Sequence, residues 1–385
     1  MKKSFSMLDA LAAELTELES KHLLRRRRTV ESAQGVRVRV AGRELRNFCG
    51  NDYLGLANDA GLKAAASAAI AEYGVGSGSS HLVCGHQAPH ELLEQRFAGM
   101  VGLPAALGFA TGYMANLGVI TALVGRGDAV FADRLNHASL NDACLLSRAD
   151  FVRFNHNDLD GLARQLAAST ARRKLIAVDA VYSMDGDLAP LQALLALAER
   201  FDAWLYLDDA HGFGVLGEGK GSLAHWQLDS PRLIYLATLG KAAGTAGALV
   251  AAERTVIDWL LNKARTAIYT TAAPAAVAAA TLASLDAIER DGWRRDCLFA
   301  RIAQLREGLA SSRYRLPAWS TPIQPIELET SQQALALAEA LWQRGIWVAA
   351  IRPPTVPTPR LRITLSAAHS EADVAALVAA LHELE

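Results

Sequence analysis

The 385-residue sequence has few cysteines, no excess of either charge and no long apolar run. Its four cysteines are far apart and form no Cys-x-x-Cys pair, which favours reduced thiols in the cytoplasm over a disulfide framework. The 39 basic and 40 acidic side chains give a formal net charge of -1, so the composition provides no attraction to nucleic acid or to an anionic membrane. We therefore expect small-molecule partners.

No segment predicts export or membrane insertion. The most apolar tract, residues 272–285, contains Pro274 and ends before Asp286, which is shorter than the roughly 20 residues that span a bilayer. We interpret this tract as a buried helix. The N-terminus starts with basic residues, but Asp9 and Glu14 follow before any long apolar stretch, so we expect no signal peptide. Internal repeats and low-complexity linkers are also missing from the sequence, which disfavours domains joined by a tether.

The central part of the chain, residues 47–254, predicts an α/β fold. Short apolar runs predict seven strands at residues 105–109, 129–132, 151–154, 175–180, 203–207, 233–237 and 246–252. Helical periods between them predict helices at residues 61–73, 90–101, 113–124, 159–168 and 191–201. Strands that are apolar throughout and are separated by helices indicate a mostly parallel sheet with helices on both faces.

The flanking segments predict two smaller parts. Residues 6–24 predict an amphipathic helix with Ser6 and Asp9 as a capping pair, and an edge hairpin follows with Gly42 in its turn. The C-terminal region predicts strands at residues 323–328, 346–351 and 361–365 and helices at residues 332–343 and 371–384. We expect an N-terminal helix and hairpin arm (1–46), a large α/β domain (47–285) and a small α+β domain (286–385).

Three motifs suggest other chemistries, but each lacks a required feature. Gly212-Phe-Gly-Val-Leu-Gly217 has the dinucleotide-binding pattern, yet the segment after it is too rich in glycine to start a helix. In the overlapping phosphate-loop pattern, Gly221 stands where Ser or Thr must bind magnesium. His90-Glu-Leu-Leu-Glu94 starts like a zinc-protease helix, but Glu94 replaces the second histidine, so we expect no metal site.

Polar residues follow several of the predicted strands. Asp208 and His211 follow the strand at 203–207, and Lys241 follows the strand at 233–237 among small residues. Polar residues at strand ends and lysines in loops are common on protein surfaces. Each of these three residues could therefore be a solvent-exposed side chain without a catalytic role. Asp208 and Lys241 together favour a pyridoxal phosphate (PLP) site, because that cofactor needs a Schiff-base lysine and a carboxylate for its pyridinium nitrogen.

Other predicted strand ends offer the remaining groups that PLP needs. Gly112 and Tyr113 open a helix after a strand, so backbone N–H groups there can hold a phosphate. His137 follows the strand at 129–132 and can stack on a ring, and Ser183 follows the strand at 175–180. These strand ends together predict one PLP site at the edge of the sheet.

Five segments occur in the order and approximate spacing of the α-oxoamine synthases, which are fold-type-I PLP enzymes that condense an amino acid with an acyl thioester. The segments are Asn47-Phe-Cys-Gly-Asn-Asp-Tyr-Leu-Gly-Leu, Asp133-Arg-Leu-Asn-His-Ala-Ser, Tyr182-Ser-Met-Asp-Gly-Asp, Asp208-Asp-Ala-His-Gly and Leu239-Gly-Lys. The resemblance covers nearly the whole chain. The segment Ala350-Ile-Arg-Pro-Pro-Thr-Val-Pro is most similar to the members that use L-alanine and a pimeloyl thioester in biotin biosynthesis.

The resemblance implies roles for individual residues. Lys241 would form the Schiff base with PLP, Asp208 would pair with the pyridinium nitrogen, and His137 would stack on the ring and act in catalysis. The other implied cofactor contacts are Gly112, Tyr113, Ser183, His211, Thr238 and, from a neighbouring subunit, Thr271. The implied substrate contacts are Arg25, Asn51, His137, Arg352 and Thr355. The resemblance also implies a homodimer with shared active sites.

The activity that the resemblance implies is acyl transfer to L-alanine with loss of carbon dioxide and release of a thiol. A glycine-using member of the family is one alternative, because a pocket discriminates one methyl group by only about 1–3 kcal/mol. A PLP-binding regulator or scaffold is another, although binding alone would not require Lys241, Asp208 and His137 together. The sequence also leaves open whether the acyl carrier is coenzyme A or an acyl-carrier protein.

Overall fold

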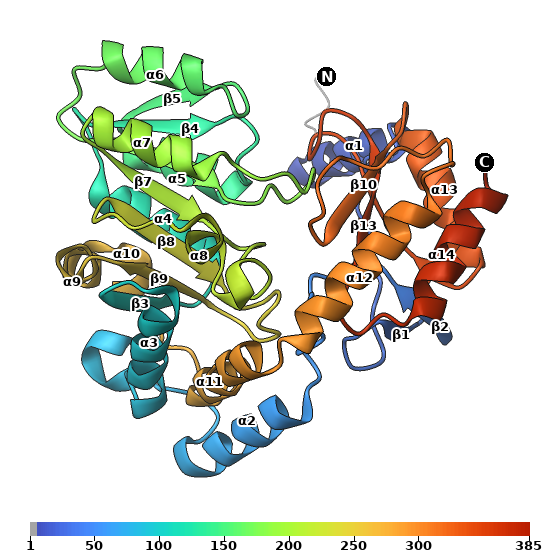
Figure 1. Ribbon diagram of the computed structural model, residues 1–385, viewed down its shortest axis with the longest axis horizontal. Helices are drawn as coiled ribbons and strands as arrows, with labels where there is room; N and C mark the ends of the chain where they lie inside the picture. Colours follow the sequence, from blue (N-terminus) through green and yellow to red (C-terminus); the bar gives the residue numbers. More distant parts are fainter. Residues whose placement is uncertain (1–5) are drawn as a thin grey trace. The chain divides into compact units, whose positions relative to one another are not determined.

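The computed structural model describes residues 6–385, and contacts divide the chain into two compact units (Figure 1). Unit 1 comprises Met1–Gly50, Ala300–Leu365 and His369–Glu385, and unit 2 comprises Asn51–Phe299 and Ser366–Ala368. The three-part division at residues 46 and 285 stays a prediction, and the first five residues of its arm lie outside the described part of the chain.

Unit 2 contains a seven-stranded sheet with the strand order β3-β9-β8-β7-β6-β4-β5 (Figure 1). The strands are β3 (Ala105–Phe109), β4 (Ala129–Asp133), β5 (Asp150–Phe154), β6 (Lys174–Asp179), β7 (Ala203–Asp208), β8 (Leu233–Thr238) and β9 (Ala248–Ala252). Strand β9 runs antiparallel to both of its neighbours, and all other neighbouring pairs are parallel. The predicted mostly parallel sheet of seven strands is confirmed.

Helices cover this sheet and build a common core with it. Unit 2 contains α2 (Ala60–Tyr73), α3 (Ala88–Val101), α4 (Gly112–Leu123), α5 (Ala138–Ser147), α6 (Leu159–Ala168), α7 (Leu191–Arg200), α8 (Ser222–Trp226), α9 (Arg254–Lys263), α10 (Arg265–Ile268) and α11 (Ala275–Arg290). Helix α12 (Trp293–Gly308) begins in unit 2 and ends in unit 1. Buried side chains such as Val119, Leu140, Val130 and Tyr206 belong to one hydrophobic cluster formed by helices and strands.

Helix α5 was not predicted from the sequence. Half of its residues are Ser, Asn, Asp and Cys, which are mediocre helix formers, and they offset the strong helical preference of its Ala and Leu residues. It forms because the His137 side chain accepts a hydrogen bond from the Ser139 N–H at its start and because Leu140 and Cys144 are buried against the sheet. Tertiary packing therefore decides this helix.

Unit 1 contains two three-stranded sheets, ordered β1-β2-β11 and β10-β13-β12. Its elements are α1 (Met7–Ser20), β1 (Arg37–Val40), β2 (Arg43–Asn47), β10 (Ile323–Glu327), α13 (Ser331–Gln343), β11 (Ile346–Trp347), β12 (Ala349–Ile351), β13 (Arg360–Thr364) and α14 (Glu371–Glu383). The predicted Ser6 and Asp9 capping pair is present at the start of α1. Among the described residues, no helix combines the length and the apolar character that crossing a membrane requires.

One predicted strand of unit 1 is wrong in its extent. The segment 346–351 forms two strands, because β11 pairs in parallel with β2 whereas β12 pairs antiparallel with β13. The alternation of apolar residues along a segment does not reveal which partner each half will find. The hairpin turn was predicted correctly: Ala41 and Gly42 both have positive φ, as two-residue turns that match strand twist require.

Candidate active site

The carboxyl ends of the parallel strands bring acidic and hydroxyl side chains to one edge of the unit 2 sheet. Asp179 ends β6 and lies directly opposite Asp208, which ends β7. The buried Asp208 carboxylate accepts hydrogen bonds from Asn116 Nδ2 at 2.8 Å and from the Ala210 N–H at 3.1 Å. These donors hold a negative group where the sheet ends, which suits a carboxylate partner for a protonated ring nitrogen.

Lys241 belongs to a hydrogen-bonded series of side chains. Its Nζ lies 2.8 Å from His211 Nε2, and His211 Nδ1 lies 2.7 Å from the Tyr53 hydroxyl. That hydroxyl donates its single proton to Asn51 Oδ1 at 3.2 Å, so it accepts the proton of His211 Nδ1. His211 Nε2 is then left as an acceptor that faces the lysine amine.

A phosphate-sized anion has suitable partners where α4 begins. The first N–H groups of a helix have no acceptor within the helix and attract anions, and Gly112 and Tyr113 supply two of them. A Cβ atom at Gly112 would collide with Cγ2 of Thr238, so glycine lets the end of β8 approach the helix. The Thr238 hydroxyl is buried and has no hydrogen-bond partner. These two N–H groups and the Thr238 hydroxyl fit the phosphate of PLP, which would accept a hydrogen bond from the hydroxyl.

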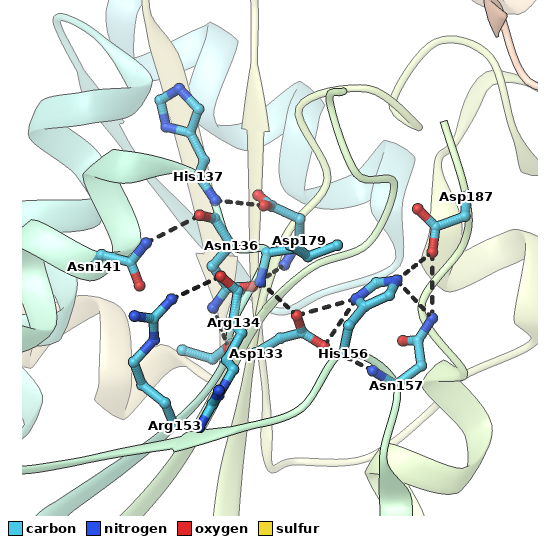
Figure 2. Close-up of polar contacts among 12 residues, drawn as sticks. Asp133, Arg134, Asn136, His137, Asn141, Arg153, His156, Asn157, Asp179 and Asp187 are labelled. Carbon is cyan, nitrogen blue, oxygen red and sulfur yellow. Dashed lines mark hydrogen bonds and ion pairs between the residues drawn. The ribbon is translucent and has the colours of Figure 1, made fainter. Parts of the chain in front are cut away.

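His137 has its backbone and its ring fixed by separate contacts. Figure 2 shows its backbone N–H donating to Asp179, at 2.7 Å. Ring atom Nδ1 lies 2.7 Å from the Ser139 hydroxyl, which itself accepts a hydrogen bond from Asn116 Nδ2 at 2.8 Å. Nδ1 also accepts the Ser139 backbone N–H at 3.3 Å, so Nδ1 carries no proton, the Ser139 hydroxyl donates to it, and the ring proton is on Nε2.

The electrostatic surroundings of His137 favour its neutral form. Burial and the positive charge of Lys241 lower its pKa, and they outweigh the charges of Asp208 and Asp142, which act in the opposite direction. A neutral ring with a proton on Nε2 can stack on a flat group and can also donate that proton.

A second histidine, His156, connects the end of β4, just before His137 in the sequence, to the turn after β6. His156 Nδ1 lies 3.1 Å from Asp133, which ends β4, and its Nε2 lies 2.7 Å from Asp187, as Figure 2 shows. Burial opposes protonation of the ring, but the hydrogen bonds and charges of the two carboxylates prevail and raise the pKa of His156 to about 10. His156 is therefore a cation that ties β4 to the turn that carries Ser183.

The second carboxylate after β7 has a structural role. Asp209 is fully buried and accepts hydrogen bonds from the Ser222 N–H, the Ser222 hydroxyl and the Tyr235 hydroxyl, at 2.6 to 2.7 Å. Gly221 has φ +90°, and a Cβ atom there would collide with the Tyr235 hydroxyl. The glycine-rich segment after Gly212 thus packs around Asp209, which explains it without a dinucleotide.

The remaining predicted contacts of unit 2 lie in loops. Ser183 is half-buried in the turn after β6, where the Gly186 N–H donates to the Tyr182 carbonyl. Thr271 is exposed and forms an isolated β-bridge with Ser80. The locations of these two residues do not test the cofactor contacts predicted for them, so both contacts stay predictions.

Three predicted substrate contacts come together within unit 1. Arg25 Nη2 donates to the Thr355 hydroxyl at 3.1 Å, and Arg352 donates to the His22 carbonyl. Burial and the nearby charge of Arg25 lower the pKa of Arg352. Two guanidinium groups that repel each other form a site where a bound anion is stabilised.

Asn116 and Ser139 were missed by the sequence analysis. Asn116 is buried in the apolar helix α4, and its Oδ1 accepts a proton from the buried Tyr206 hydroxyl at 2.7 Å. A lone amide inside an apolar helix must find partners in the core, so its position was the available signal. Its actual partners, Asp208 and Ser139, lie on other elements and become visible only in the fold.

Comparison with known proteins decides the family. The profile of aminotransferase class I and II matches residues 43–381 of the chain. The chain belongs to the class I and II aminotransferase family. This membership confirms the predicted fold class.

Relatives within the aminotransferase family agree with the motif resemblance. An 8-amino-7-oxononanoate synthase of Methylobacillus flagellatus is 56% identical over 98% of this chain and 96% of its own length. One of Chromobacterium violaceum is 58% identical over 96% of this chain and 97% of its own length. These similarities confirm the resemblance to the α-oxoamine synthases.

Solved structures share the fold at lower identity. A serine palmitoyltransferase with a PLP internal aldimine matches with a TM-score of 0.93 and 29% identity, covering 98% of both chains. An 8-amino-7-oxononanoate synthase of Francisella tularensis matches with a TM-score of 0.77 and 28% identity, covering 88% of this chain and 97% of the other.

Proposed function

We propose that this chain is a PLP-dependent acyltransferase of biotin biosynthesis that condenses L-alanine with a pimeloyl thioester. The products are 8-amino-7-oxononanoate, carbon dioxide and the free thiol. The observation that carries the proposal is the 56–58% identity, over nearly the full length, to relatives named for this product. Asp208 and the Lys241, His211 and Tyr53 series supply the chemistry that such a reaction needs.

Pyridoxal phosphate, when bound, supplies an electron sink for the charge that develops at the amino-acid Cα. Asp208 would hold the ring nitrogen, and His137 would stack on the ring. Gly112, Tyr113 and Thr238 would hold the phosphate, and Ser183 and His211 would hold the ring hydroxyl. Lys241 would be the residue that links to the cofactor.

The chain's own residues then move the protons. Lys241, as a free amine, takes the Cα proton of alanine, and the acceptor nitrogen of His211 orients that amine. His137 donates a hydrogen bond from its Nε2–H to the oxygen on which negative charge develops during carbon–carbon bond formation, because Ser139 keeps Nδ1 as the acceptor nitrogen. Arg352 and Asn51 bind the amino acid, and Arg25 and Thr355 bind the acyl donor.

We infer that the protein works in the cytoplasm as a homodimer in which Thr271 contributes to the active site of the neighbouring subunit. Coenzyme A and an acyl-carrier protein are both suitable carriers, because the reacting thioester is the same in each. The exposed position of Thr271 is compatible with a contact to another chain.

The activity is tested with a panel of amino acids and acyl thioesters, read out by thiol release. L-alanine with pimeloyl thioester should give the highest kcat/KM, and each carrier is tested separately. A higher kcat/KM with glycine would identify the glycine-using alternative instead, and thiol release with no pair would favour a binding protein.

The link to the cofactor is tested by borohydride reduction and peptide mapping of the yellow holoprotein. The reduced pyridoxyl group should be on Lys241, since, among the lysines of residues 6–385, it is the one that follows an apolar strand and contacts His211. Lys220 and Lys263 are internal controls, and a label on either of them would overturn the assignment.

A further inference from the structure

Three histidines form a cluster in unit 2 that the proposed reaction does not use. His81 begins the short helical turn η1 (His81–Gly85), His86 follows this turn, and His90 lies in the first turn of α3. One ligand atom from each of the three lies within 4.8 Å of the others. The spacing of these histidines along the sequence did not predict a metal site, because only the bend at η1 brings His81 to the other two.

The contacts of His86 determine which of its nitrogens faces the cluster. His86 Nε2 lies 3.2 Å from the Glu91 carboxylate, so it carries the proton. The other ring nitrogen of His86, Nδ1, is therefore unprotonated. It lies 2.8 Å from Nδ1 of His81 and accepts a hydrogen bond from the N–H of that ring. A carboxylate behind the imidazole is the usual outer partner of a metal-binding histidine.

His90 has the same arrangement with a backbone acceptor. Its Nε2 donates to the Ala273 carbonyl at 2.8 Å, so its Nδ1 is the unprotonated nitrogen. That Nδ1 accepts the Gln87 N–H at 3.0 Å. A carbonyl oxygen is also a common outer partner of a histidine ligand, and it fixes the same tautomer as Glu91 fixes in His86.

We propose that His81, His86 and His90 form a binding site for one divalent transition-metal ion of the kind that prefers imidazole, such as Zn²⁺. Three neutral imidazoles leave a fourth position for water or a carboxylate. Glu91 and Glu94 lie beside His86, in a second group of ligand atoms within 4.8 Å of one another.

Metal binding requires two small rearrangements. The His81 proton moves from Nδ1 to Nε2, so the ring stays neutral and the site takes up the ion without net release of a proton from this residue. His90 Nδ1 exchanges the Gln87 N–H for the ion. The outer bonds of His86 and His90 are kept, because they use the opposite nitrogens.

The cluster is attached to the segment that contains Thr271. The Ala273 carbonyl accepts hydrogen bonds from His90 and from the Ser77 hydroxyl, and the Ala272 N–H donates to the Ser79 carbonyl. A bound ion would therefore brace this segment. That consequence for catalysis rests on the proposed function, in which Thr271 contacts the cofactor, whereas the binding of the ion does not.

The test is titration of metal-free holoprotein with Zn²⁺ by calorimetry, and with Co²⁺ by visible spectroscopy against the cofactor background. We expect one ion per chain in the wild type. His81→Ala and His86→Ala should abolish this binding, and Glu91→Gln should weaken it about 10- to 100-fold, as loss of an outer partner does.

Matched controls separate the cluster from other metal ligands, including the cofactor phosphate. His225→Ala removes an exposed histidine in α8, and Cys84→Ser removes the exposed thiol within η1, so both should bind as the wild type does. Circular dichroism and the cofactor absorbance confirm folding of each variant. Absence of stoichiometric binding, or binding that survives both His81→Ala and His86→Ala, would overturn the proposal, and neither result would affect the thiol-release assay.

Discussion

At the scale of single residues, hydrogen-bond donors hold the side chains of the proposed site in place. Asn116 donates to Asp208 and to Ser139, and Ser139 passes a proton toward His137. One buried amide thus positions both the carboxylate and the ring of the proposed site. The direction of the Ser139–His137 hydrogen bond follows from the Ser139 backbone N–H, which donates to the same Nδ1 and leaves that atom without a proton.

The role of Asp208 is tested by Asp208→Asn. An amide does not stabilise a protonated ring nitrogen as a carboxylate does, so kcat should fall by about 100- to 1,000-fold while PLP remains bound. Steady-state kinetics and the cofactor spectrum measure the two effects. Asp209→Asn is the matched control on the adjacent residue, and it should lower the unfolding temperature more than the activity of the folded protein, because Asp209 accepts structural hydrogen bonds. Near-normal turnover of Asp208→Asn would contradict the assignment.

The tautomer of His137 is tested by Ser139→Ala. Without the hydroxyl, one donor that favours an unprotonated Nδ1 is lost, so the His137 pKa should rise. We expect an upward shift of the acidic limb of the pH–rate profile and a loss of activity of roughly 10-fold, which is part of the usual contribution of a general acid. Ser147→Ala, at the other end of α5, is the control and should change neither. An unchanged His137 pKa, measured by NMR, would show that Ser139 does not hold the ring.

The substrate role of Arg25 is tested by Arg25→Ala. The variant loses a charge-assisted contact to an anionic group of the acyl donor, which is worth about 1.5–3 kcal/mol, or roughly 10- to 100-fold in KM. The KM for pimeloyl thioester should rise by this factor, the KM for alanine should not, and the cofactor spectrum should stay the same. Arg26→Ala is the neighbouring control, because Arg26 only pairs with the exposed Glu19. Equal effects on both substrates would place Arg25 with its surface neighbours.

At the scale of secondary-structure elements, the half-buried His156 and two buried carboxylates join the end of β4 to the turn after β6. His156 lies between Asp133 and Asp187, and Asn157 adds hydrogen bonds to both carboxylates (Figure 2). Strand β4 leads into His137, and the turn contains Ser183. These contacts therefore hold two parts of the proposed site at a fixed separation.

This arrangement predicts a pH dependence of stability. The folded pKa of His156 is about 10, whereas an unfolded histidine titrates near a pKa of ~6.5. Its contribution is therefore fully present below about pH 6.5 and is lost as the pH rises toward about 10. Urea unfolding of the wild type should show this decline of the unfolding free energy.

His156→Gln should remove that decline and destabilise the protein at neutral pH by about 3 kcal/mol, because two carboxylates lose their cation. The exposed His225→Gln is the control and should keep the wild-type slope. If His156→Gln also keeps that slope, the histidine is not the group that titrates.

At the scale of the whole molecule, the proposal requires active sites shared between two chains. It is tested by mixing Lys241→Ala chains with Thr271→Glu chains, in which the new carboxylate should repel the cofactor phosphate. Each variant alone should be nearly inactive, but a mixed dimer has one site that combines an intact Lys241 with an intact Thr271. Activity should therefore return on mixing.

Thr170→Glu places the same charge at another exposed threonine of unit 2 and should be active without mixing. Sedimentation and co-purification of differently tagged chains verify the exchange of subunits. Activity that stays at the level of the separate variants, despite verified exchange, would mean that Thr271 does not serve a neighbouring site.

The sequence by itself determined the succession of strands and helices along the chain and the polar residues that follow the strands. Strands that are buried on both faces form short runs of apolar residues, and helices show a period of 3.6, so these patterns identified all seven strands of the large sheet and most of its helices. The polar residues Asp208, His211 and Lys241 stood out because they interrupt apolar runs. Their motifs sufficed to indicate the family.

Only the tertiary structure decided which side chains meet. Asn116 lies 92 positions before Asp208, and His81 and His86 face each other only because a helical turn bends the chain between them. The same holds for Asp209, whose hydrogen bonds with Ser222 and Tyr235 under the glycine-rich loop are visible only in the fold. Hydrogen-bond partners and tautomers depend on distances of about 3 Å between remote segments, and local periodicity carries no information about such distances.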